Sequence, residues 1–161
     1  MASFDRDFYN YFKDVAEQHL KIGSVTQMQW DTMLAQWNLG QLKDFVLILE
    51  QPDATPRGMK DGYPMLRIDA AFTVAHKAKV GDAHGNNDLY DEINQIILDI
   101  LGRLIHQFYP VRPKDFFMRF LNDDFNIVAT LPLNSRTFIG KRCQFSYETV
   151  AGIQYNSEKW Q

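Results

Sequence analysis

The length of 161 residues fits one domain, because domains cluster near about 100–150 residues and a chain of this size buries most of its apolar surface. Hydrophobic residues make up 45% and charged residues 23%, a balance that excludes wholesale disorder and a fibrous architecture. The net charge is −3 and the Lys and Arg residues are scattered, which argues against sequence-specific nucleic-acid binding. No apolar run approaches the ~20 residues that span a bilayer, and the N-terminus carries no secretion signal. We therefore expect a soluble protein that is made and kept inside a cell, or inside a particle assembled there.

Two helices are expected in the first quarter of the chain. From Phe4 to Ile22 the apolar residues recur every three or four positions, which is one face of an amphipathic helix that Gly23 can end. From Met28 to Leu42 the spacing of the tryptophans and methionines also predicts a helix.

A buried strand and a loop are expected next. Phe45 to Leu49 is a continuous apolar run of strand length, which indicates a strand covered on both faces. Asp53 to Gly62 contains Pro56, Gly58 and Gly62 among polar residues, so a loop is predicted there.

The clearest element is a long strand from Met65 to Val80. Its apolar residues alternate with polar ones, which is the pattern of a strand with one wet face. Sixteen extended residues span about 50 Å, whereas a compact chain of this length has a radius of gyration near ~15 Å. The adjacent strand ending at Gln51 is less than half as long, so the end near Lys77 is predicted to be an unpaired edge, which is either blunted by Lys77 and Lys79 or covered by another chain.

A second long helix and a closing pair of strands complete the chain. Gly81 to Asn87 has turn chemistry, and Asn87 or Asp88 is expected to cap a helix that runs to Phe108. A short helical turn is predicted from Lys114 to Leu121. Alternating segments from Phe125 to Leu131 and from Thr137 to Val150 predict an antiparallel hairpin. The sequence thus predicts one α+β domain over residues 1–161, with an antiparallel or mixed sheet that contains a long strand hairpin and packs against two to three helices.

The histidines and carboxylates form no recognisable catalytic or metal site. No two of His19, His76, His84 and His106 have the i, i+4 spacing of a helical zinc site. The loop from Gly81 to Asp88 could in principle ligate a cation, but it lacks calcium-loop spacing and is more typical of a turn and cap. Neither a Ser or Cys nucleophile with its base nor a phosphate-binding loop is present in the sequence, so we expect no enzyme and no cofactor.

Two further groups are interpreted as structural. Cys143 lies in an alternating apolar register and is expected to be a buried, inert thiol. The cluster of Met28, Trp30, Met33 and Trp37 is more typical of a core than of a ligand pocket, although a pocket there would make the chain a small ligand-binding or accessory domain. An enzyme with an unfamiliar site is the third alternative.

The order of elements resembles that of a known family. An N-terminal helix, a long extended strand, a central helix after a polar loop and a closing segment from Gly140 to Tyr147 are similar to the tail-terminator and tail-completion proteins of tailed bacteriophages. That resemblance implies a non-enzymatic virion protein, assembled in the host cytoplasm, that forms a ring at the tail or neck, typically of six copies, and joins other tail or neck proteins.

Two segments are predicted to contact neighbouring subunits. The first follows from the unpaired strand end and includes His76, Lys77, Lys79 and Val80. The second is the C-terminal tail, residues 151–161, in which Tyr155 and Trp160 are aromatic anchors without a strand or helix period.

Overall fold

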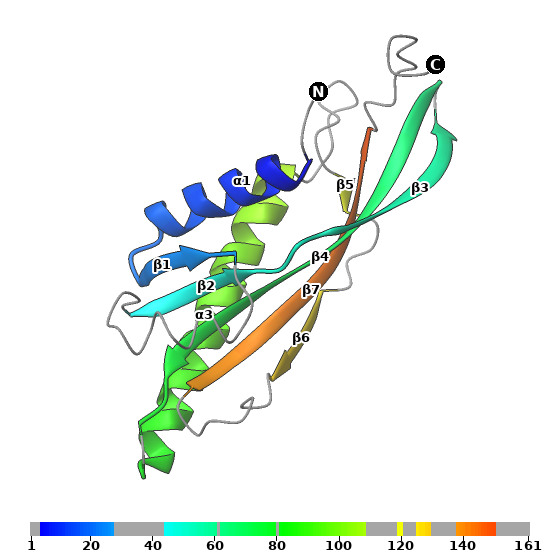
Figure 1. Ribbon diagram of the computed structural model, residues 1–161. Helices are drawn as coiled ribbons and strands as arrows, with labels where there is room; N and C mark the ends of the chain where they lie inside the picture. Colours follow the sequence, from blue (N-terminus) through cyan, green and yellow to red (C-terminus); the bar gives the residue numbers. More distant parts are fainter. Residues whose placement is uncertain are drawn as a thin grey trace, which may run out of the picture.

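The computed structural model describes residues 4–27, 44–60, 62–79, 81–108, 119–120, 125–129 and 138–150. Figure 1 shows two helices lying on one face of a twisted sheet. In chain order the elements are α1 (Phe4–Gln18), β1 (Ile22–Thr26), β2 (Phe45–Leu49), β3 (Asp53–Lys60), β4 (Tyr63–Lys77), α3 (Ala83–Phe108), β5 (Arg119–Phe120), β6 (Asn126–Ala129) and β7 (Phe138–Val150). The predicted α+β class is confirmed.

All described strands belong to one mixed sheet, in the order β1-β2-β4-β7-β5, with β3 also pairing with β4 and β6 with β7. β1 runs parallel to β2, and the other pairs are antiparallel. β4 and β7 pair without interruption from Met65 opposite Val150 to Lys77 opposite Phe138. This pair of long strands is the axis to which the shorter strands attach, and the predicted pairing of β6 with β7 is confirmed.

The alternating pattern sets the two faces of the sheet. Ile68, Phe72 and Val74 of β4 belong to the same buried cluster as Cys143 and Phe145 of β7, together with residues of both helices. The intervening residues of β4 and β7 therefore face away from the helices. β2 is buried at all five positions, as its continuous apolar sequence predicted.

Aromatic rings from the N-terminal helix form the centre of the core. Phe8 and Phe12 of α1 have ring centroids 4.7 Å apart, and the Phe12 ring lies 5.4 Å from that of Phe72 and 6.3 Å from that of Phe145. Such tilted aromatic contacts add to the gain from burying the ring area. α3 lies beside α1 and covers the sheet with a wide apolar face. This face is fully buried and is formed by Ile93, Ile96, Ile97, Ile100 and Leu104.

The first helix is shorter than predicted. It ends at Gln18, the side chain of Leu20 is fully exposed, and Ile22 begins strand β1 opposite Phe45 of β2. The prediction was wrong because Ile22, Val25 and Thr26 are β-branched residues that pair with β2, a long-range contact that overrides the helical spacing.

The predicted loop from Asp53 to Gly62 is wrong for most of its length, because residues 53–60 form strand β3. Pro56 is tolerated since β3 is an edge strand, and Gly58, with a φ of 82°, lies within a register shift between Pro56 and Met59. Lys60 pairs with Tyr63, the first residue of β4, at the tip of the pair.

The start of α3 and the segment before β6 also differ from the predictions. α3 begins at Ala83 rather than after Asn87 or Asp88, because Asp82 Oδ1 accepts a hydrogen bond from the Gly85 backbone N–H at 2.8 Å. Residues 119–120 of the predicted helical turn instead form β5 beside β7. The predicted helix from Met28 to Leu42 lies entirely outside the described residues. Neither described helix is long and apolar enough to cross a membrane.

Replacing Phe12 with Ala is expected to lower the free energy of unfolding by ~3–5 kcal/mol, because the ring is fully buried among four other aromatic rings. The control is Leu20→Ala at a fully exposed side chain, for which a change within ~0.5 kcal/mol is expected. Equilibrium urea unfolding measures both values. Equal losses for the two variants would contradict the assignment of the core.

Candidate interaction surfaces

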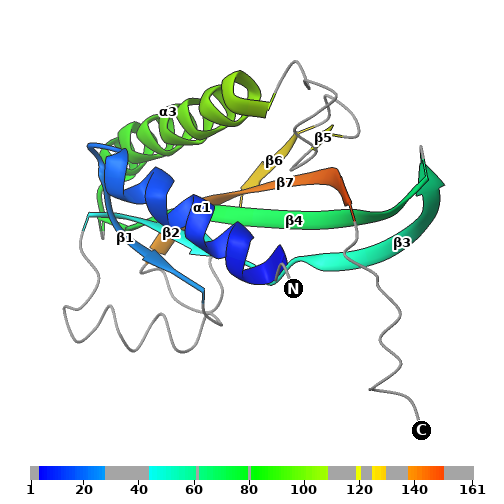
Figure 2. The same cartoon turned by 90° about the horizontal axis from the view of Figure 1, so that it is seen from above.

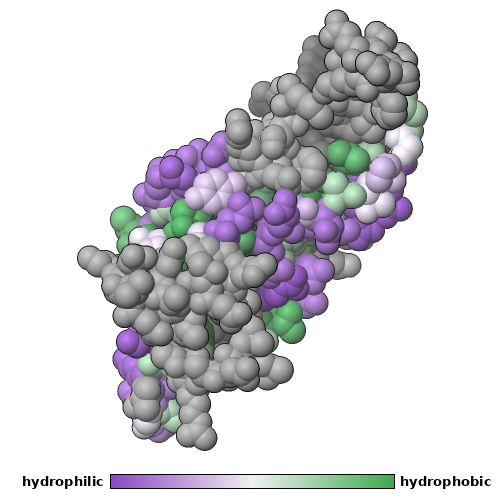
Figure 3. Space-filling view, in the orientation of Figure 1, coloured by the Kyte–Doolittle hydropathy of each residue, from purple (hydrophilic) through white to green (hydrophobic). Residues whose placement is uncertain are grey.

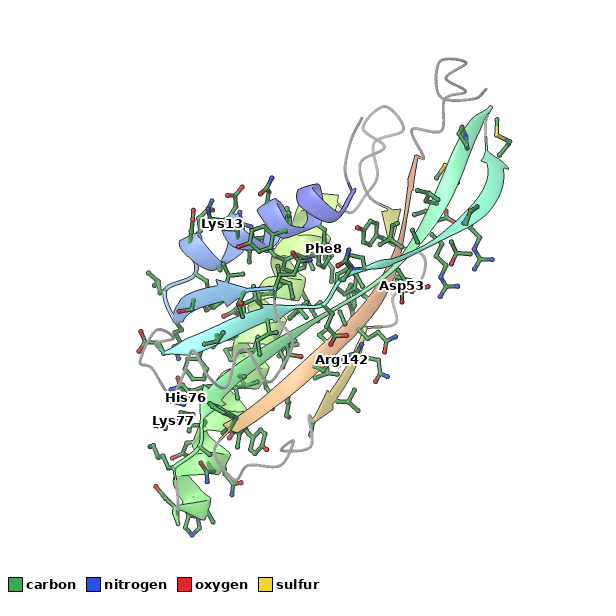
Figure 4. The ribbon with its side chains drawn as sticks, viewed as in Figure 1. Phe8, Lys13, Asp53, His76, Lys77 and Arg142 are labelled. Atoms are coloured by element: carbon green, nitrogen blue, oxygen red, sulfur yellow. The ribbon has the colours of Figure 1, made fainter. Side chains whose placement is uncertain are left out.

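The Lys77 end of β4, where an unpaired edge was expected, is paired along one of its two edges. Lys77 pairs with Phe138 of β7, and on the other side of β4 the His76 ring lies 4.7 Å from the Phe45 ring of β2. His76 Nδ1 also lies 2.8 Å from the Lys77 carbonyl oxygen. Figure 4 places His76 and Lys77 together at this end of the strand. On the β7 side the expectation of an unpaired edge is therefore wrong, because β7 pairs with β4 from Met65 to Lys77, whereas the pairing with β2 on the other side ends at Ala75.

Internal hydrogen bonds hold the turn that follows β4. The Asn86 side chain accepts a hydrogen bond from the Lys79 backbone N–H at 2.8 Å and donates one to the Lys79 carbonyl at 3.0 Å. A Cβ on Gly85 would overlap the Asp82 carboxylate, so this cap needs glycine. These bonds support the structural interpretation of the loop. Val80, Tyr155 and Trp160, the other predicted interface residues, lie outside the described residues.

The end of β4 that projects from the molecule is the opposite one. β3 and the facing part of β4, residues 63–69, form a hairpin that we call the arm. In Figure 2 the arm curves past the ends of both helices. β3 is exposed from Asp53 to Met59, and the Met59 side chain is 68% exposed. The predicted strand was thus long enough to leave the globular body, but it does so at its N-terminal end.

A polar network stiffens the base of the arm on the sheet face away from the helices. Arg67 Nε donates a hydrogen bond to Asp69 Oδ1 at 2.9 Å, and Arg67 Nη2 donates one to Ser146 Oγ of β7 at 3.2 Å. Ser146 Oγ in turn donates to Asp69 Oδ1. The Ser146 hydrogen bond, with smaller contributions from Arg67 and Arg57, lowers the pKa of Asp69 below its ordinary value.

An ion pair crosses β4 further along the same face. Arg142 of β7 donates two hydrogen bonds to the Glu50 carboxylate, with Nη2 to Oε2 at 2.7 Å. Glu50 follows β2, on the far side of β4, and the β4 residues between the two strands are the small Ala71 and Thr73. Both small residues are buried. The sheet face that was predicted to contact water is therefore polar, but its charged side chains pair with one another. Figure 3 shows hydrophilic side chains along this part of the sheet.

Two other surfaces expose apolar side chains. All four residues of the edge strand β6 are exposed, including Ile127 and Val128. On α3, Leu98 is 54% and Ile105 is 44% exposed, and Gly102 lies between them. These positions are seven residues apart and thus share the face of α3 that points away from the sheet. The spacing of apolar residues groups Ile105 with the buried face of the helix and leaves Leu98 outside it, so the sequence alone does not predict this stripe.

Cys143 is completely buried, as predicted. Burial raises the pKa of its thiol to about 12, so the reactive thiolate form is suppressed at neutral pH. Among the residues that the structure describes, no three His, Cys, Asp or Glu side chains are grouped so that they could hold a metal ion.

Comparison with known proteins adds no relative. No protein-family model matches the chain, and no curated protein is significantly similar to it.

Replacing Asp69 with Asn is expected to destabilise the protein by about 1 kcal/mol at pH 7, since hydrogen bonds to a carboxylate are lost at a partly exposed position. The folded-state pKa of Asp69 is lowered, so its contribution is present above the unfolded pKa of ~3.9 and is lost as the pH falls through the folded value. The difference between the variant and the unaltered protein should therefore shrink below about pH 4.

Asp53→Asn is the matched control, because Asp53 is exposed and lies directly opposite Asp69 on the neighbouring strand. This variant should be neutral or slightly stabilising at pH 7. Urea unfolding across the pH range gives both results, and a pH-independent loss for Asp69→Asn would contradict the proposed role of its charge.

Proposed function

We propose that this chain is a non-catalytic assembly protein of a phage or phage-like particle, and that its copies form a closed ring at the tail or neck. The observation that carries the proposal is the arm, which extends past both helices and exposes the described side chains of β3 from Asp53 to Met59. In the assembled particle the ring joins other tail or neck proteins.

The arm would be a disadvantage in a protein that acts alone. A two-stranded hairpin is at best marginally stable in water, and an exposed strand edge invites association. Here the base of the arm is stiffened by the network of Arg67, Asp69 and Ser146, and β7 pairs with β4 as far as Met65. A stiff projection keeps one shape before it binds, so less conformational entropy is lost on association. These properties favour a role in subunit contact.

The layout of the chain supports the phage assignment. The structure has an N-terminal helix, a long extended strand, a central helix after a polar turn and a closing strand, in the order that resembles the tail-terminator and tail-completion proteins. The competing ligand-binding interpretation depends on Trp30 and Trp37, which lie outside the described residues. No observation on the described residues favours it.

The proposal predicts that the purified full-length chain, or the chain mixed with its neighbouring tail or neck proteins, assembles into a closed ring. Light scattering after size-exclusion chromatography measures the mass, and negative-stain electron microscopy shows the shape. A single multimeric mass together with ring-shaped particles is the expected result. A chain that stays monomeric at every concentration, with and without those proteins, would contradict the proposal.

A further inference from the structure

The structure also points to the contact that would link the copies. We propose that the arm of one copy packs across the outer face of α3 of the next copy, with Met59 against Leu98 and Ile105, and with Arg57 facing Asp91. This inference rests on the proposed self-assembly and names the surfaces that mediate it.

The two surfaces cannot meet within one chain. β3 is part of the sheet, and α3 packs on that sheet through a buried face that includes Ile97 and Ile100. The stripe of Leu98 and Ile105 lies on the opposite face of α3 and so points away from its own arm. Only the arm of a second copy can reach it.

A contact between two different surfaces has the symmetry that a ring requires. When a copy offers its arm to one neighbour and its α3 face to the other, the contact is head-to-tail, and repetition of a head-to-tail contact closes into a ring or grows into a filament. A pairing of β6 with β6 of a second copy would instead give a two-fold dimer. β6 is also only four residues long, which provides little area compared with the ~800 Å² that each partner buries in a stable interface.

The apolar groups on the two surfaces are complementary. Met59 is the large apolar side chain that β3 leaves exposed, and methionine adapts its shape to irregular partners. Leu98 and Ile105 lie about 10 Å apart along the α3 axis, with Gly102 between them. Among the described residues, no atom outside the adjoining helix backbone and neighbouring residues lies within 4 Å of the position that a Cβ on Gly102 would take, so this part of α3 is open toward the described surroundings.

The charges on the two surfaces are also complementary. β3 carries Arg57 and Lys60, and its one acidic residue is at its base. From Ala83 to Gly102, α3 carries neither lysine nor arginine but has four carboxylates, at Asp88, Asp91, Glu92 and Asp99. Glu92 pairs with Lys21 and Asp99 with His19, whereas Asp91 has no ion pair among the described residues.

The spacing allows both contacts at once. Arg57 and Met59 lie two residues apart on the edge strand β3, and the register shift between Pro56 and Met59 directs their side chains to opposite faces of the arm, so they flank the same strand edge. Asp91 lies about 10 Å along α3 from Leu98. The long Arg57 side chain reaches past the strand edge toward Asp91. In such a contact the buried apolar groups supply most of the affinity, and the exposed charges fix which way the arm lies.

The test is a charge exchange in the full-length chain. Arg57→Glu and Asp91→Arg should each shift the main species from ring to monomer at the same protein concentration, because two like charges then face each other. The double variant restores an attractive pair and should recover the ring. Both residues are exposed, so circular dichroism and thermal unfolding should stay unchanged in all three variants.

The control is Lys13→Glu, a charge reversal on the exposed face of α1 that should leave the ring intact. Two results would overturn the contact while leaving the ring itself standing: rings that are unaffected by either single change, or single losses that the double variant does not recover. Loss of the ring in Lys77→Glu but not in Arg57→Glu would place the contact at the other end of β4. An unaltered chain that never assembles would contradict the ring and the contact together.

Discussion

The antiparallel pairing of β4 with β7 is the constraint on which the rest of the structure depends. It fixes Phe72 opposite Cys143 and Ala70 opposite Phe145, so the apolar residues of both strands share one face. A shift of one residue would turn Phe72 away from the helices, because side chains alternate along a strand. With the register set, α1 and α3 have a continuous apolar surface to cover, and the polar residues meet one another on the other face.

The same pairing lets one strand serve two purposes. In its C-terminal half, β4 lies between β2 and β7 under both helices, where Val74 and Ala75 are completely buried. In its N-terminal half, β4 pairs with β3 and leaves the helix layer as the arm. The core therefore holds the arm in place, and the Glu50–Arg142 ion pair ties β2 to β7 across β4 near the point where the two halves meet.

Local sequence patterns were sufficient to predict the helices and strands that do not depend on a distant pairing partner. The alternation in β4 and β7 and the apolar stripe of α3 predicted those elements, the burial of Cys143 and the polar face that carries Arg142 and Ser146. The helix before β1 was extended too far because β1 exists only through its pairing with β2, some twenty residues away.

The surfaces were harder to predict than the core. Pro56 and Gly58 predict a loop, yet both are compatible with an edge strand that contains a bulge. The dipeptide Asp61-Gly62 is a strong hairpin signal and would have identified the arm. The pairing at the Lys77 end of β4 could not be predicted, because the register between β4 and β7, which are more than sixty residues apart, cannot be read from either strand alone.

A cysteine pair across the proposed contact tests the central claim most directly. Met59→Cys and Leu98→Cys together place one thiol on the arm and one on the outer face of α3, while the buried Cys143 does not compete. After mild oxidation, denaturing gels without reductant should show a ladder of covalent multimers that ends at the mass of the ring, and neither single variant should give that ladder. If the double variant remains monomeric on those gels although the ring forms in solution, the arm does not lie on α3 of its neighbour.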